Sequence, residues 1–178
     1  RGLLLILCLL TIDAFAQLNF GLVGSASSSG NNCFELTPEL TNQSGAVWYT
    51  NVVDLTNDFV IDFDANFGNR DANGADGIAL VFKTTSTAVI GGTGGGIGYG
   101  GISPSVAVEF DNFENNSTTF GILGDIAADH IAVQRDGIAN HNTGWANLAG
   151  PLQASLTSAN IEDGNYHNIR VEYFAATV

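Results

Sequence analysis

The stretch Val106-Ala-Val-Glu-Phe-Asp111 alternates its side chains with the period of two that is typical of a β-strand. Its two valines and Phe110 therefore face one side, while Glu109 and Asp111 share the other. Two neighbouring carboxylates repel each other and lose hydration when they are buried. Such a pair persists in a folded protein when a cation or a catalytic proton compensates for its charge. The stretch thus predicts a strand around which both the fold and a functional site are built.

The residues that follow supply more groups of the same kind. Asn115 comes shortly after the strand, Asp125 follows a polar loop, and His130 opens the β-like run 130–134. We interpret this pattern as a hairpin whose loop supplies Asn115 and Asp125 and whose return strand brings His130 beside the carboxylates. Oxygen ligands suit calcium, whereas carboxylates with one imidazole suit a manganese-like transition ion. Asp111 and Asp125 could bridge the two ions.

These residues resemble the metal motif of the legume-type (L-type) lectins and their bacterial relatives. The strand ends in Glu109-Phe-Asp, an Asn lies four residues after that Asp, and Asp125 lies five residues before His130. The intervening loop is longer here. By this resemblance Glu109 and His130 bind only the transition ion, Mn2+ or a similar metal, while Asp111 and Asp125 bridge it to Ca2+.

The same resemblance implies the rest of the calcium shell and the sugar site. Asn115 and the carbonyl of Phe113 complete the calcium shell, and the Phe113 ring stacks on a sugar. Upstream, Gly74-Ala-Asp-Gly-Ile-Ala-Leu-Val-Phe82 resembles the loop that carries the sugar-binding Asp76, which follows a non-proline cis peptide after Ala75. The glycine-rich run 94–98 resembles the loop that donates a backbone amide, which we assign to Gly95. The expected carbohydrate-binding residues are Asp76, Gly95, Phe113 and Asn115.

The whole chain has an all-β pattern. Short β-branched and aromatic segments alternate with Gly, Asn, Ser and Asp clusters, and no amphipathic helix is evident. We expect strands at 34–36, 46–49, 59–63, 78–82, 106–110, 130–134 and 166–174, with Trp48 in the core. The resemblance implies one concanavalin-like β-sandwich (jelly roll) over residues 17–178. Because the chain stops within an apolar run, we expect this sandwich to be incomplete at its C-terminus.

The N-terminus and the charge indicate the compartment and the class of partner. Arg1, a short apolar run and Ala14-Phe-Ala16 match a signal peptide over residues 1–16, so we expect a secreted or cell-surface protein. The formal net charge of −13 disfavours nucleic-acid binding, and the apolar run is too short to insert across a membrane. Cys33 is expected to be buried and unpaired. Further domains could be fused to this one.

Three functions remain open from the sequence. The first is calcium-dependent carbohydrate binding without catalysis, with a glycan or polysaccharide as the partner. The second is a laminarinase-type retaining glycoside hydrolase, because Glu109-Phe-Asp-Asn-Phe-Glu114 fits a pattern with Glu109 as nucleophile and Glu114 as acid/base. The third is an adhesion sandwich that uses calcium only for rigidity. His141 and His167 have no carboxylates at ligand spacing, so we expect them at the surface or in turns.

Overall fold

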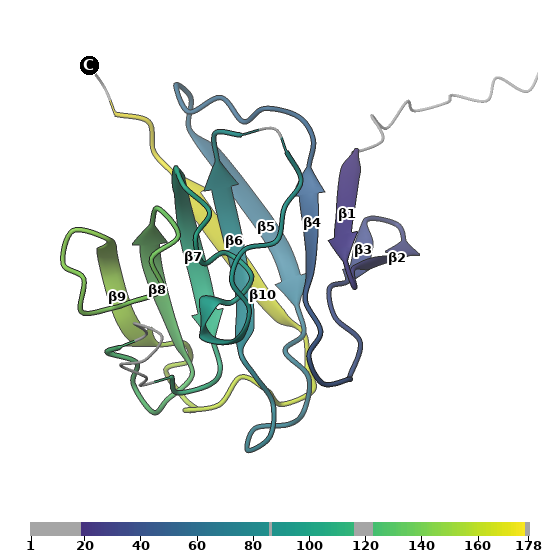
Figure 1. Cartoon of the computed structure of the whole chain (residues 1–178), viewed down its shortest axis with the longest axis vertical. Coiled ribbons are helices and arrows are strands. Elements are labelled where there is room, and N and C mark those ends of the chain that lie inside the picture. Colours follow the sequence, from purple (N-terminus) through teal and green to yellow (C-terminus); the bar gives the residue numbers. More distant parts are fainter. Residues whose placement is uncertain (1–18, 86, 116–122, 177–178) are drawn as a thin grey trace, which may run out of the picture.

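A computed structural model describes residues 19–85, 87–115 and 123–176, in which β-strands dominate (Figure 1). The predicted signal peptide lies outside the described residues. The strands are β1 (Phe20–Gly24), β2 (Ser27–Gly30), β3 (Cys33–Glu35), β4 (Gly45–Tyr49), β5 (Phe59–Ala65), β6 (Gly77–Lys83), β7 (Ser105–Asp111), β8 (His130–Arg135), β9 (Asn147–Gln153) and β10 (His167–Tyr173). One 3₁₀ helix, η1, spans Gly94–Gly96. In the described parts of the chain, no helix combines the length and the apolar character needed to cross a membrane.

Strand β7 lies inside a four-stranded antiparallel sheet with the order β6-β7-β8-β9. Its last residue, Asp111, pairs with Gly77 of β6 on one side and with His130 of β8 on the other. The predicted hairpin from the carboxylate strand to the His130 strand is therefore confirmed. Because the three strands are in register, the start of β6, the end of β7 and the start of β8 meet at one edge of the sheet.

A second layer packs behind this sheet. Strands β5 and β10 pair with each other and cross behind β6 and β7 (Figure 1). Aromatic contacts join the layers, since the ring centroids of Phe63 and Phe110 lie 6.4 Å apart and those of Phe59 and Phe82 lie 5.8 Å apart. The pairs β1-β4 and β2-β3 complete the described strands. This arrangement is the predicted concanavalin-like β-sandwich.

The other face of β7 packs against the glycine-rich segment. Buried Ile97, Tyr99 and Ile102 contact Ala107, and Trp48 packs against this cluster. The indole Nε1 of Trp48 donates a hydrogen bond of 2.8 Å to the carbonyl of Val89. Trp48 is thus partly buried and packs against the core, which agrees with the predicted packing role, and its indole N–H has a partner. The packing fixes the glycine-rich segment over the face of β7 that carries Glu109.

The sequence pattern found the strands that carry the site and missed weaker ones. All seven expected strands overlap observed strands, but β1, β2 and β9 were not predicted. Strand β9 contains Pro151 and pairs with β8 through two register shifts, so it lacks a clean alternation. The expectation for Cys33 was wrong. It is exposed in β3, the short partner of the wholly exposed β2.

Candidate functional site

The edge where β6, β7 and β8 meet gathers the polar residues that the sequence singled out. Asp76 immediately precedes β6, and the expected cis peptide between Ala75 and Asp76 is confirmed. Gly77 follows at φ +136°, and a Cβ there would lie 2.2 Å from the carbonyl oxygen of Phe110. Only glycine allows β6 to approach β7 this closely. The close approach brings Asp76 to the end of β7, where its carbonyl accepts a hydrogen bond from the Asn112 N–H.

Asp111 is buried at the centre of this edge. The backbone N–H of Phe113 donates a hydrogen bond of 2.9 Å to Asp111 Oδ1, while Asp111 Oδ2 lies 3.9 Å from His130 Nε2. Burial raises the pKa of Asp111 to about 8, partly countered by the Phe113 hydrogen bond and reinforced by the charges of Asp125 and Glu109. Without a cation this carboxylate is therefore held in its neutral form at neutral pH.

Asn115 joins the predicted metal residues to the predicted sugar residues. Its backbone N–H donates a hydrogen bond of 2.6 Å to Asp125 Oδ2. Its side-chain Nδ2 donates to Asp76 Oδ1 and to the carbonyl of Phe113, each at 3.1 Å. Residues 116–122, between Asn115 and Asp125, lie outside the described residues. Asn115 thus links Asp125, 10 residues after it in the sequence, to Asp76, 39 residues before it.

An open hollow lies beside Asn115. It is lined by Asn115, the glycine-rich residues 92–96 and 100–101, the residues 137–140 and Thr143. A Cβ built on Gly94 would lie 4.0 Å from Asp76 Oδ2, so the glycine-rich loop runs next to the Asp76 carboxylate. Gly95 lines the hollow and is itself buried, whereas Phe113 is 44% exposed. The hollow is therefore lined by amide and backbone groups, and the Asp76 carboxylate lies next to two of its lining residues, Gly94 and Asn115.

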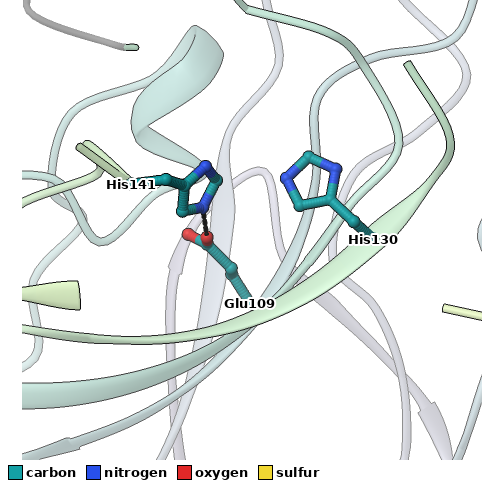
Figure 2. Close-up of side chains that lie close together, drawn as sticks. All are labelled: Glu109, His130 and His141. Atoms are coloured by element: carbon teal, nitrogen blue, oxygen red, sulfur yellow. Dashed lines mark hydrogen bonds and ion pairs between the residues drawn. The ribbon is translucent and has the colours of Figure 1, made fainter. Parts of the chain in front are cut away.

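His141 lies in a turn, as expected, but it is not at the surface. Its side chain is buried and its Nε2 is hydrogen-bonded to Glu109 Oε1 (Figure 2). Its Nδ1 lies 2.9 Å from Asp125 Oδ1. Burial favours the neutral ring, but the contacts with Asp125 and Glu109 outweigh it and raise the pKa of His141 to about 9. Spacing along the sequence missed this residue because Glu109 lies 32 residues away.

Two further contacts hold the buried side chains in place. Tyr99, fully buried, donates a hydrogen bond of 2.5 Å from its hydroxyl to Glu109 Oε2. Burial and the charge of Glu109 raise the pKa of Tyr99, so its hydroxyl stays a donor. His130 Nδ1 lies 3.1 Å from the carbonyl of Ala128, which can only accept, so Nδ1 carries the proton. Burial lowers the pKa of His130, which favours the neutral ring, so its Nε2 carries a lone pair.

The donor set fits metal ions. One donor atom each from Asp111, Asp125 and His130 lies within 4.8 Å of the others, and the same holds for Glu109, His130 and His141. In the described parts of the chain, the buried Nε2 of His130 has no hydrogen-bond partner. A buried lone pair without a donor is available as a ligand atom for a cation. The structure therefore carries groups suited to holding metal ions.

The hydrolase pattern does not assemble as a pair. Both carboxylate oxygens of Glu109 are engaged, one by Tyr99 and the other by His141, and the side chain is 1% exposed. Glu114 is exposed. A retaining glycosidase needs two carboxyl groups that face one sugar from either side of the bond to be broken. A buried, occupied Glu109 and an exposed Glu114 do not provide that arrangement.

Comparisons with known proteins agree with this geometry. The profile of the L-type lectin domain, described as the legume lectin beta-barrel domain, matches residues 11–178. The pesticidal crystal protein Cry22Aa of Bacillus thuringiensis is 36% identical over 93 residues, which are 52% of this chain and 13% of that protein.

Two solved structures share the fold. Basic winged bean lectin with Tn-antigen superposes with a TM-score of 0.64 at 22% identity, over 88% of this chain and 64% of that chain. A lectin from Bauhinia forficata in complex with GalNAc gives 0.60 at 19% identity, over 87% and 67%. At these identities the likeness shows the fold alone, and the chain spans only part of each protein. The match of the family profile over nearly the whole sequence shows that this chain belongs to the L-type lectin domain family.

Proposed function

We propose that this chain binds carbohydrate without catalysis, in the hollow beside Asp76, Asn115 and the glycine-rich loop. The observation that carries the proposal is the hydrogen bond of 3.1 Å from Asn115 Nδ2 to Asp76 Oδ1. It joins two polar side chains from separate segments, and one of them, Asn115, lines an open hollow. Membership of the lectin family supports a sugar ligand, as do the Tn-antigen and GalNAc named for the two solved lectins.

We further propose that binding depends on calcium. Asp111, Asp125, Asn115 and the Phe113 carbonyl would hold Ca2+, and Glu109 and His130 would hold a transition ion such as Mn2+ that shares Asp111 and Asp125. The ions would neutralise the buried carboxylates and fix the segment that carries Asn115. Asp76 and a glycine amide, assigned to Gly95, would then hydrogen-bond sugar hydroxyls, and Phe113 would stack on the ring. Secretion or display at the cell surface, and fusion to further domains, belong to the same proposal.

A glycan array with and without chelator, run beside a reducing-sugar assay on β-glucans, tests the proposal. We expect binding that chelator abolishes, binding that calcium restores, and no release of reducing ends. Calcium should also raise the melting temperature, because an ion that binds only the folded state stabilises it by mass action. Calcium binding without any glycan binding would support the adhesion sandwich instead. An unchanged melting temperature in chelator would contradict calcium dependence.

A further inference from the structure

The ring of His141 lies beside that of His130, and its Nε2 contacts the carboxylate of Glu109 (Figure 2). The two imidazole rings have centroids 5.1 Å apart and are nearly perpendicular, at 74°. His130 and Glu109 are each 1% exposed and His141 is 8% exposed, so all three side chains are buried. Each of these polar groups loses hydration on burial, so an interaction inside the protein must compensate for that cost.

In each ring, one nitrogen contacts a supporting group and the other is placed where it could coordinate a metal ion. His130 donates Nδ1–H to the Ala128 carbonyl, and its Nε2 has no hydrogen-bond partner in the described parts of the chain. His141 directs Nε2 to Glu109 Oε1 and has Asp125 Oδ1 at 2.9 Å from Nδ1. A carboxylate behind an imidazole is the usual support of a metal-bound histidine, because it fixes the ring and raises the basicity of the other nitrogen.

Glu109 is held in the matching orientation. The Tyr99 hydroxyl engages Oε2 at 2.5 Å, which leaves Oε1 on the side of the two histidines. Asp125 contacts two neighbours at once. Its Oδ1 lies behind His141, and its Oδ2 accepts the Asn115 N–H. The buried contacts thus aim one oxygen and two nitrogen atoms at a common place.

We infer that His141 is a third protein ligand of the transition ion, and that the site formed by Glu109, His130 and His141 prefers Zn2+ to Mn2+. The inference rests on the proposed metal centre and changes its composition. Two imidazoles and one carboxylate form a ligand set typical of zinc, whereas Mn2+ favours carboxylates and water. Asp125 then supports His141 and faces calcium together with Asp111.

Metal binding to the whole chain tests the inference directly. The chain is stripped with chelator and saturated with Ca2+, and Zn2+ and Mn2+ are titrated against a chromophoric competitor at about pH 7.5. We expect one Zn2+, bound at least about tenfold more tightly than Mn2+. His141→Ala should weaken Zn2+ on the order of 10- to 100-fold and leave calcium affinity nearly unchanged. His141→Asp should keep an ion but bring the Zn2+ and Mn2+ affinities together.

His167→Ala is the matched control, since His167 is partly exposed on β10 and pairs with Asp163 instead. It should leave Zn2+ affinity unchanged. X-ray absorption of the zinc-loaded parent chain needs no variant and should count two imidazole ligands. Three results would each overturn the inference. They are a count of one imidazole ligand, an equal Zn2+ affinity in His141→Ala and in the parent, and a parent chain that binds calcium but no transition ion. If calcium-dependent glycan binding is still observed after such a result, the proposed function stands. If zinc binds as expected but glycan binding is absent, the proposed function alone is overturned.

Discussion

The molecule contains two clusters of buried carboxylates, and the groups around them differ. The first, the histidine cluster, comprises Glu109, Asp111 and Asp125 with His130 and His141. The second, the acidic cluster, comprises Asp129 and Glu162 with the exposed Asp71 nearby. Asp125 and Asp129 are almost equally buried, at 8% and 7% exposed, and lie on the same short segment before β8. They nonetheless belong to different clusters.

The two clusters differ in what compensates for their charge. In the histidine cluster, imidazole nitrogens face the carboxylates and one lone pair lacks a donor in the described parts of the chain, which is the arrangement of a cation site. In the acidic cluster, Asp129 Oδ2 accepts the Ile161 N–H at 2.7 Å, and Arg70, next to Asp71, is ion-paired with Glu39 instead. Burial and the charges of Asp129 and Asp71 raise the pKa of Glu162 to about 7. Proton uptake by Glu162 therefore limits repulsion in the acidic cluster, whereas the histidine cluster, in which Asp111 and His141 also take up protons, has in addition imidazole groups that can bind a cation.

The largest expected effect comes from exchanging one aspartate in each cluster for its isosteric amide. Asp125→Asn removes the negative charge that faces His141 and the predicted calcium, so calcium affinity should fall on the order of 100-fold and glycan binding should be lost with it. Asp129→Asn should leave both affinities unchanged within about threefold, because the oxygen of the new side-chain amide can still accept the Ile161 N–H. Calorimetric titration of calcium and a glycan array measure the pair. Equal losses in both variants would show that the two clusters act as one site.

A smaller effect is expected from Glu162→Gln, and its sign depends on pH. The pKa of Glu162 is about 7 in the folded chain against an ordinary value of 4.5, so between these values the folded chain binds more protons than the unfolded chain. Its contribution to the unfolding free energy is therefore complete below about pH 4.5 and is lost as pH rises through 7. We therefore compare the melting temperature of Glu162→Gln with that of the parent at two pH values. The difference, variant minus parent, should be a few °C larger at about pH 7.5 than at about pH 4.5.

Calcium and an exposed glutamate provide the controls for that measurement. Adding calcium at the higher pH should leave the difference between Glu162→Gln and parent unchanged, because the acidic cluster is not expected to bind it. Glu35→Gln, at the exposed end of β3, is the matched variant and measures what the same substitution does to the melting temperature outside the acidic cluster. A calcium-dependent difference for Glu162→Gln would mean that the acidic cluster also holds the ion.

The same contrast explains what the sequence could and could not predict. The alternation in β7 is local, so it indicated the strand, the shared face of Glu109 and Asp111, and the hairpin to His130. The convergence of Asp76 with Asn115 was available only through the family resemblance, because 39 residues separate them. The roles of His141 and Tyr99 depend on how the glycine-rich segment and the loop after β8 fold over β7. Nothing in the local pattern of either residue indicates a carboxylate partner.

Strand β9 and the acidic cluster escaped prediction for a related reason. Pro151, Gly150 and two register shifts remove the alternation from β9, although it pairs with β8 as an edge strand. Glu162 looks like a solvated loop residue in the sequence, yet a Cβ on Gly74 would lie 1.9 Å from Glu162 Oε1. The absence of a side chain at Gly74 makes the space that Glu162 occupies. Such long-range packing is a property of the assembled sandwich.

The smallest expected effect concerns a carboxylate outside both clusters. Glu114 follows β7 and is exposed, so its charge is screened by water. Glu114→Gln should therefore change glycan affinity by about twofold at most, the size usual for exposed positions. In a retaining hydrolase the same change would remove the acid/base group and depress turnover by orders of magnitude. The array and the reducing-sugar assay are run on parent and Glu114→Gln side by side, with Asp125→Asn as the contrasting variant. Glycan hydrolysis by the parent that disappears in Glu114→Gln would overturn the proposed function, whatever the metal measurements show, because no site that only binds sugar requires that carboxyl group.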